Sequence, residues 1–445
     1  MSQPALGSRA QGEDLSLDEL HDVWRLLAPE DRLAAFHLVP HDSGEDFFLA
    51  LSTAEQAALL VTLPAKERRA WLRLLPPDDA ADVIQAALPA ARQEFLALLD
   101  DSTRKEVSAL LAYAEDQAGG LMNPRFARLR PEMSVDEAIA YLRRQVRELE
   151  TAHYIYVLDA EQRLLGVVSF RELFPVPPER TVQEVMHRDV VTAHEHLDQE
   201  ALGRLFATHR YLAIPIVDDE QHIKGIVTMD DIVDVVQEEA TEDIQKIGGM
   251  EALDAPYLQI GMGRMVRKRG GWLSALFLGE MLTATAMGYF EAEIARAVVL
   301  ALFVPLIISS GGNSGSQATT LVIRAMALGE VKIRDWWRVI RRECVAGLTL
   351  GSILGTIGVA RILLWHGAFG VYGEHYLLVA LTVGASLVGV VLWGTLAGSM
   401  LPFVLRRLGF DPASASAPFV ATLVDVSGLL IYFTTASVIL SGTLL

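Results

Sequence analysis

Long apolar stretches dominate the second half of the chain. Five of them run approximately over Trp272–Phe290, Ala295–Arg324, Cys344–Leu364, Leu377–Leu405 and Ala415–Leu440. A helix needs about 20 mostly apolar residues to cross a lipid bilayer. The pattern therefore predicts five transmembrane helices within residues 271–445, and the odd number places the two ends of the chain on opposite sides of the membrane.

The charges between these stretches predict the orientation. Basic residues gather before the first stretch, between the second and third, and between the fourth and fifth: Arg264, Arg267, Lys268, Arg269; Lys332, Arg334, Arg338, Arg341, Arg342; Arg406, Arg407. Loops rich in Lys and Arg stay in the cytosol. We therefore expect a multi-pass protein of the cell (inner) membrane with a cytoplasmic N-terminus and an outside C-terminus. The polar segment Met1–Leu20 does not predict a cleaved signal peptide.

A leucine repeat marks the beginning of the chain. Leu27, Leu51, Leu75 and Leu99 recur at a constant spacing, and Ser52 with Glu55 has the spacing of a capping box. Short capped helices that repeat in this way stack as an α-solenoid. Residues 1–120 are therefore expected to form an acidic helical-repeat domain.

A second repeat follows, with two copies of one pattern at a constant offset. Tyr156–Ser169 and Pro215–Thr228 each have an apolar strand, an acidic turn, a glycine and a second apolar strand. The pair resembles a tandem CBS (cystathionine-β-synthase-type) domain, expected over residues 121–243. In that family a Thr or Ser and an Asp hold a nucleotide ribose, which implies Thr228 and Asp231 as a site for ATP. The first copy has Ser169 and Glu172 instead, and a plain dimerisation module is the alternative.

Charge separates the two halves. The chain carries 38 Lys and Arg against 56 Asp and Glu, of which residues 261–445 hold 14 and 9, so residues 1–260 hold 24 and 47. This acidic balance argues against nucleic acid as a partner and suggests cations, with simple solubility as the alternative. The single cysteine, Cys344, excludes a disulfide framework within the chain.

Two apolar stretches contain residues that are unusual in lipid. Pro305–Thr320 includes Gly311, Gly312 and Gly315 beside Asn313 and Gln317. We expect these residues to break the helix and to expose carbonyl oxygens, which are suitable cation ligands, along a water-filled path. Small residues at a tight helix crossing are the alternative.

Asp425 lies well inside the last stretch, away from both of its ends. Ala417, Ala421 and Asp425 share one helix face at a spacing of one helical turn. An ionised carboxylate at membrane depth is costly and marks a functional site. In a two-fold dimer two such aspartates would face each other across a pore and contact a hydrated Mg²⁺ ion. A structural aspartate bonded to a nearby Ser or Thr is the alternative.

The motifs G-G-N-x-G-x-Q and D-P-A…P…T-x-x-D-x-x-G, in this order and layout, resemble those of the MgtE-type Mg²⁺ transporter and channel family. The resemblance covers nearly the whole chain. It implies a mainly α multidomain fold: an α-solenoid N domain, an α/β CBS pair, a connecting (plug) helix over residues 244–270, and a five-helix transmembrane domain. It also implies pore and selectivity residues Asp425, Ala421, Ala417, Gly312, Asn313 and Ser316. Ala417 and Ser316 stand where the family often has amides.

The resemblance further implies a regulatory Mg²⁺ site. The matching carboxylates are Asp78, Asp82, Asp231, Glu239, Glu242, Asp243 and Asp411. Repulsion among them would hold the cytosolic domains apart until Mg²⁺ neutralises them and closes the pore. We therefore expect a homodimeric, lipid-embedded Mg²⁺ channel; the sequence leaves open whether other divalent cations also pass.

Other functions fit less well. An ion-coupled secondary carrier is the main alternative, but no inverted repeat is evident, and Glu280, the one further carboxylate within a span, is expected to be buried in packing. A membrane enzyme is not expected, because no Ser-His-Asp, HExxH or Walker pattern appears. A sensor without transport leaves Asp425 unexplained.

Overall fold

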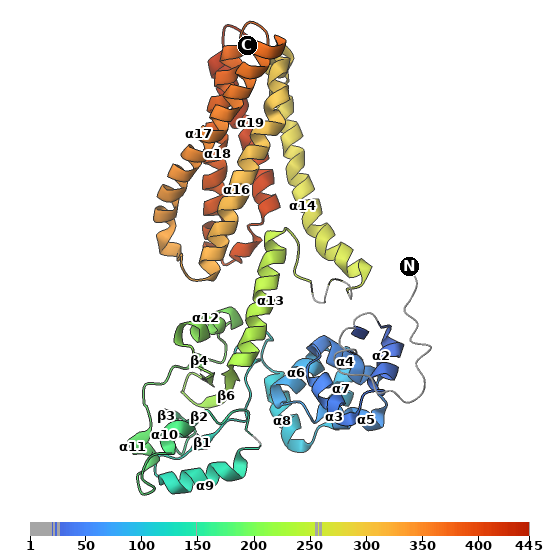
Figure 1. The fold of residues 1–445 in the computed structure, drawn as a ribbon, viewed down its shortest axis with the longest axis vertical. Coiled ribbons are helices and arrows are strands. Elements are labelled where there is room, and N and C mark those ends of the chain that lie inside the picture. Colours follow the sequence, from blue (N-terminus) through green and yellow to red (C-terminus); the bar gives the residue numbers. More distant parts are fainter. Residues whose placement is uncertain are drawn as a thin grey trace. The chain divides into compact units, whose positions relative to one another are not determined.

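The computed structural model describes residues 20, 23–24, 27–147, 149–253, 257 and 260–444 (Figure 1). The chain divides into two compact units, residues 1–236 and residues 237–445. The polar segment from which we expect no signal peptide falls almost wholly on residues 1–19, which lie outside the described residues.

The first unit begins with the predicted helical repeat. Leu51, Leu75 and Leu99 are all buried, and each stands just before the N-cap residue of a helix. Alternate helices pack on one another, and the capping box forms: the Ser52 hydroxyl donates to Glu55 at 2.7 Å. The helices are α2 (Pro29–Phe36), α3 (His41–Leu49), α4 (Thr53–Thr62), α5 (Ala65–Leu72), α6 (Pro77–Ala86), α7 (Pro89–Leu98) and α8 (Asp101–Leu110).

Two three-stranded sheets follow and confirm the second repeat. Their orders are β1-β2-β3 and β4-β5-β6, and in each the first pair is parallel and the second antiparallel. Tyr154 pairs with Ser169 and Ala213 pairs with Thr228, so the two copies keep the same register. The strands are β1 (Arg128–Leu129), β2 (Tyr154–Leu158), β3 (Leu164–Ser169), β4 (Ala193–His194), β5 (Ala213–Val217) and β6 (Ile223–Thr228); the helices are α9 (Val135–Gln145), α10 (Phe170–Leu173), α11 (Val182–Val185) and α12 (Gln199–His209).

The long connecting helix lies earlier than expected. Helix α13 (Met229–Ile247) begins directly after Thr228, and Gly249, with φ of +75°, follows its end. A left-handed backbone at this point favours glycine and ends a helix. Of the expected range 244–270, the described residues 248–253 form no helix, residues 254–256 and 258–259 lie outside the described part, and α14 (Met262–Tyr289) begins soon after.

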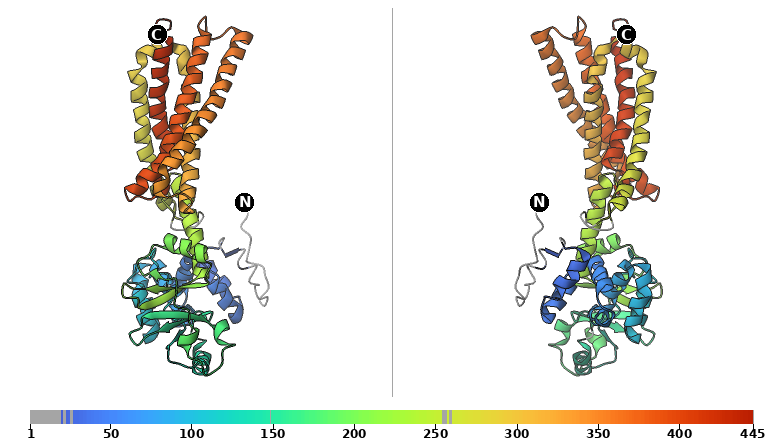
Figure 2. Two further views of the ribbon diagram at one scale, coloured as in Figure 1. Left: turned by 90° about the vertical axis from the view of Figure 1, so that its left-hand side faces the viewer. Right: turned by 90° about the vertical axis from the view of Figure 1, so that its right-hand side faces the viewer.

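The second unit is a helix bundle (Figure 2). Among its described helices, four are long and apolar enough to cross a membrane: Val298–Ala327, Ile333–Phe369, Tyr376–Arg407 and Ala417–Leu440. Helix α14 has 28 residues, but its polar and small residues, Glu280 among them, lower its hydropathy. The elements are α15 (Glu291–Arg296), η2 (Val298–Phe303), α16 (Val304–Ala327), η3 (Ile333–Asp335), α17 (Trp336–Phe369), α18 (Tyr376–Arg407), η4 (Pro412–Ser414) and α19 (Ala417–Leu440).

The expected break in the second apolar stretch is wrong. Helix α16 runs without interruption through Gly311, Gly312 and Gly315. A Cβ atom at Gly311 would lie 2.5 Å from Cγ1 of Val390, and one at Gly315 would lie 2.8 Å from the carbonyl oxygen of Gly394. The glycines therefore allow the backbones of α16 and α18 to meet, which is the tight-crossing alternative. The intact helix keeps its carbonyls in its own hydrogen bonds, so they are not free ligands.

Candidate functional site

The crossing of α16 and α19 brings together five of the six predicted membrane-site residues. A Cβ atom at Gly312 would lie 3.4 Å from Cα of Ala421 and 3.8 Å from Oδ1 of Asp425. One turn further along α16, the Ser316 hydroxyl donates to the carbonyl oxygen of Ala417 at 3.1 Å. The missing side chain at Gly312 thus leaves room beside the carboxylate.

Asn313 lies on a different face of α16. Its side chain is exposed, and Nδ2 donates to the Ser309 hydroxyl at 3.4 Å. Ser309, Asn313 and Gln317 are all exposed and follow one another at a spacing of one helical turn, so they form one polar stripe. Within one chain this stripe does not meet Asp425.

Asp425 is half-buried and has no ion pair with any residue that the structure describes. The nearby hydroxyls are used elsewhere: Thr422 donates to the carbonyl oxygen of Pro418, and Ser427 donates to that of Leu423. The alternative of an aspartate held by a Ser or Thr therefore has no support in these contacts. An uncompensated carboxylate at membrane depth is suited to a passing cation.

A second group of carboxylates lies within the first unit, between α6 and the sheets. Asn123 is 1% exposed, and its Nδ2 donates to Oδ1 of Asp78 at 3.0 Å and to Oε2 of Glu150 at 2.7 Å. Backbone bonds in both directions with Ile226 fix Asn123 beside β6. One amide group thus holds two carboxylates that are far apart in the sequence.

Burial and mutual repulsion raise the pKa values in this group. Burial raises the pKa of Asp78 well above its usual range, with further contributions from Asp79, Asp231 and Glu150. Burial and the charges of Asp231, Asp230 and Asp79 raise the pKa of Glu150 to about 7. Burial raises the pKa of Asp231 to about 6, although two hydrogen bonds from Thr228 oppose the shift. Such a group needs protons or a cation to be neutralised.

We name this group the acidic cluster; its members are Asp78, Asp79, Glu150, Asp230, Asp231 and Asp234. Of these residues, the sequence pattern indicated Asp78 and Asp231 but not the others, nor Asn123. A signal was available, because D-D-x-x-D occurs at Asp78–Asp82 and again at Asp230–Asp234. Asp82 is half-buried one turn beyond Asp78 on α6.

A third group lies in the second unit, where α13 meets η4. Glu239, Glu242 and Asp243 are half-buried on α13. The Lys246 ammonium forms ion pairs with Glu242 and, at 2.6 Å, with Asp411. Burial opposes the charge of Lys246, but its bonds to Asp411 and Glu242 raise its pKa. A lysine therefore already bridges two of the predicted cation ligands.

Thr228 and Asp231 are bonded to each other. The Thr228 hydroxyl donates to Oδ2 of Asp231 at 2.6 Å, at the start of α13. The neighbouring carboxylates would repel a polyphosphate, so a nucleotide at this position stays a prediction without support from the geometry. The equivalent Ser169 and Glu172 have the same bond at 2.7 Å, and Glu172 also contacts His187 at 2.9 Å.

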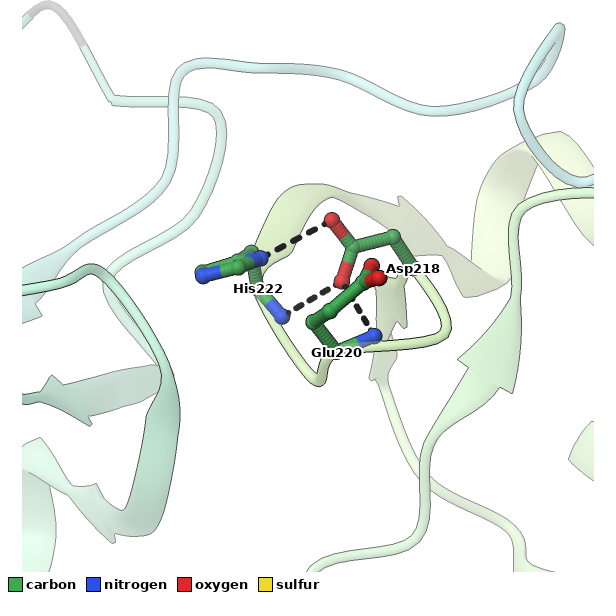
Figure 3. Close-up of side chains that lie close together, drawn as sticks. All are labelled: Asp218, Glu220 and His222. Carbon is green, nitrogen blue, oxygen red and sulfur yellow. Dashed lines mark hydrogen bonds and ion pairs between the residues drawn. The ribbon is translucent and has the colours of Figure 1, made fainter.

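Asp218, Glu220 and His222 also gather closely enough to suggest a metal site (Figure 3). Both carboxylate oxygens of Asp218 nevertheless already have partners. Oδ1 accepts hydrogen bonds from the backbone N–H groups of Glu220 and His222, and Oδ2 contacts Nδ1 of His222 and Nζ of Lys224. Burial alone would raise the pKa of Asp218, but its bonds with Lys224 and His222 outweigh this effect and hold the pKa well below its usual range. These contacts explain Asp218 as the residue that fixes the β5–β6 turn.

Three family models match consecutive parts of the chain. The MgtE intracellular N domain matches residues 15–116, CBS domains match residues 118–177 and 182–238, and the MgtE divalent cation transporter region matches residues 304–435. The matched parts contain the solenoid, the two sheets and the membrane helices from α16 to α19, in that order.

Individual proteins are also similar to the chain over most of its length. The chain is 42% identical over 433 residues to the magnesium transporter MgtE of Thermus thermophilus, which covers 97% of this chain and 94% of the relative. It is 32% identical to the magnesium transporter MgtE of Enterococcus faecalis, over 75% of this chain and 71% of the relative. A solved cytosolic domain of the Mg²⁺ channel MgtE in complex with ATP is similar over 50% of this chain and 91% of its own, at 40% identity and a TM-score of 0.47. Because the Thermus thermophilus and Enterococcus faecalis proteins are similar to the chain over more than two thirds of their own length, the chain belongs to the MgtE family of divalent cation transporters and is a multi-pass membrane protein.

Proposed function

We propose that this protein is a Mg²⁺ channel whose permeation path passes Asp425. The observation that carries the proposal is the uncompensated carboxylate beside Gly312 and Ala421, at membrane depth. Mg²⁺ gives up its water reluctantly, so a carboxylate that contacts the ion through water suits it better than a closed cage of ligands. Both relatives described above are named magnesium transporters.

The path is proposed to lie between two copies of the chain. Ser309, Asn313 and Gln317 form an exposed polar stripe on α16, and such a stripe is costly against lipid. A two-fold partner would cover it and bring a second Asp425 to the same axis. The basic loops support a cytosolic N-terminus and, with α14 as the fifth span, a C-terminus outside.

Closure is proposed to follow from the acidic cluster. Without Mg²⁺, the negative charges of Asp78 on α6 and of Glu150 and Asp231 in the CBS pair repel one another. Mg²⁺ would bind best where these carboxylates are closest, and so would favour the compact arrangement. Glu239, Glu242 and Asp243 on α13 would carry this change toward the membrane helices, with Asp411 at the junction.

Single-channel recording of the purified protein in planar bilayers tests the proposal. We expect unitary Mg²⁺ currents that decline as Mg²⁺ on the cytosolic side rises from near zero to about 10 mM, a range chosen to cover weak carboxylate sites. Protein that gives no current yet carries Mg²⁺ into liposomes would instead support the ion-coupled carrier.

The acidic cluster also predicts a pH-dependent stability in the absence of divalent cations. The pKa of Glu150 is about 7 and that of Asp231 about 6 in the folded protein, both above their unfolded values. The folded state therefore binds more protons, and stability should fall as the pH rises from about 5 to 8. In EDTA, we expect the thermal midpoint of the cytosolic transition to fall by a few °C over this range, and Mg²⁺ to restore it at pH 8.

Thermal unfolding of the full-length protein in detergent measures this effect. Glu150→Gln should flatten the dependence, whereas Glu161→Gln, which changes an exposed turn, should leave it intact. A midpoint that rises with pH in EDTA would contradict the proposed cluster.

A further inference from the structure

Helices α14 and α19 run parallel at a constant register. Nε1 of Trp272 donates to the Ser416 hydroxyl at 3.2 Å, and a Cβ atom at Gly279 would lie 3.0 Å from Cγ2 of Thr422. The rings of Phe290 and Phe433 stack with their centroids 5.0 Å apart. These pairs differ by 144, 143 and 143 positions, and the two helices lie side by side in both views of Figure 2. Helix α14 therefore accompanies α19 over the same depth.

This register places Glu280 next to Asp425. An offset of 143 or 144 positions pairs Glu280 with residues 423 and 424, immediately before the aspartate. The charge of Glu280 also acts electrostatically on the Asp425 carboxyl group. Two carboxylates from different helices thus lie at one level of the bundle.

Glu280 is on the packed face of α14 and not on its outer face. Between residues 271 and 290, the positions that are not exposed recur every three or four residues, which is the period of one helix face. They are Trp272, Leu276, Gly279, Glu280, Thr283, Ala286, Met287 and Phe290. The same stripe contains Trp272, Gly279 and Phe290, which contact α19, so Glu280 is directed toward that helix.

No described residue compensates these two charges. Neither Glu280 nor Asp425 forms an ion pair with a Lys, Arg or His in the described ranges. One turn beyond Glu280, the Thr283 hydroxyl is buried and has no hydrogen-bond partner among the described residues. Polar and ionisable groups in a membrane domain face the interior of the bundle or a water-filled cavity, because lipid cannot solvate them, and they commonly mark an ion path.

We propose that Glu280 is a specificity-determining residue of the ion path, a second carboxylate that accompanies Asp425 and favours divalent over monovalent cations. The inference rests on the proposed transport of Mg²⁺ past Asp425. A divalent ion gains twice the Coulomb energy of a monovalent ion from each fixed negative charge at the same distance. A second carboxylate at the same depth therefore increases the preference for Mg²⁺ over K⁺ without replacing the ion's water shell.

The reversal potential measured with Mg²⁺ on one side of the bilayer and K⁺ on the other gives the Mg²⁺/K⁺ permeability ratio, which tests this inference. The full-length protein is recorded in planar bilayers with the cytosolic side kept nearly free of Mg²⁺. We expect Glu280→Gln to conduct but to lower the Mg²⁺/K⁺ permeability ratio about tenfold. Glu280→Asp, which keeps the charge, should give a ratio between those of Glu280→Gln and the wild type. Glu291→Gln makes the same chemical change in the exposed first turn of α15 and should match the wild type.

The outcomes separate this inference from the function on which it rests. A wild type without Mg²⁺ current overturns both. If the wild type conducts and Glu280→Gln has an unchanged Mg²⁺/K⁺ permeability ratio, only the role of Glu280 is overturned. The same holds if Glu280→Gln alters the pH dependence of Mg²⁺ flux but not this ratio, since that result marks Glu280 as a proton relay. If Glu280→Gln does not elute as folded protein, an unchanged ratio in Glu280→Asp decides against the inference.

Discussion

Asp425→Asn is expected to reduce Mg²⁺ flux by on the order of 100-fold while the protein stays folded. The change keeps the shape of the side chain and removes its charge, and a carboxylate about 4 Å from an ion contributes several kcal/mol at the effective dielectric constant of a partly buried site. Asp425 receives no hydrogen bond or ion pair from the described residues, so an amide at this position leaves no partner unsatisfied. Loss of flux would therefore report on the ion and not on the fold.

Uptake of Mg²⁺ into proteoliposomes, measured with an internal fluorescent indicator, gives the flux for wild type and variant at matched protein content. Glu374→Gln, in the exposed loop between α17 and α18, is the control and should transport as the wild type does. A folded Asp425→Asn variant with undiminished uptake would remove Asp425 from the path.

The double change Asp78→Asn and Asp231→Asn is expected to hold the channel shut when Mg²⁺ is absent. Both carboxylates belong to the acidic cluster, and both have raised pKa values because burial and neighbouring charges penalise their ionised forms. Neutral amides remove that penalty in the compact state, as Mg²⁺ would. The oxygen of an Asn at position 78 can still accept the bond from Asn123.

Bilayer recording in EDTA should show the open probability of this variant reduced by about tenfold or more, with little further change on adding Mg²⁺. A shift of this size corresponds to roughly 1.4 kcal/mol. Asp189→Asn changes an exposed aspartate outside the cluster and should respond to Mg²⁺ as the wild type does. Normal opening in EDTA with normal Mg²⁺ inhibition would show that the cluster is not the sensor.

The repeats could be predicted because local patterns determine them. Leu51, Leu75 and Leu99 occupy the same position in successive repeat units, and the capping box after Leu51 begins a helix whatever its neighbours are. The constant offset between the two CBS copies kept the strand registers for the same reason, since both copies have the same apolar strands, turn and glycine at equivalent positions.

The features that were missed depend on tertiary contacts. Gly311 and Gly315 suggested a broken helix, because glycine weakens an isolated helix; against α18 the missing side chains are instead what allows close packing. Asn123 joins the acidic cluster through a bridge to Ile226, which is distant in the sequence, and no local pattern marks Glu150 as its second partner. The position of Glu280 required the register between α14 and α19, which single-helix patterns do not contain.

The lysine between α13 and η4 has a thermodynamic consequence for any ion that enters there. Lys246 is attached to the same helix as Glu242, so its ammonium group competes at the high effective concentration of a tethered ligand. Mg²⁺ could reach Glu242 and Asp411 only by exchange with this internal cation, whereas no described basic residue pairs with the carboxylates of the acidic cluster in the first unit. As cytosolic Mg²⁺ rises, the ion would then bind in two stages. It would occupy the acidic cluster first, and only at higher concentration would it displace Lys246 from Glu242 and Asp411.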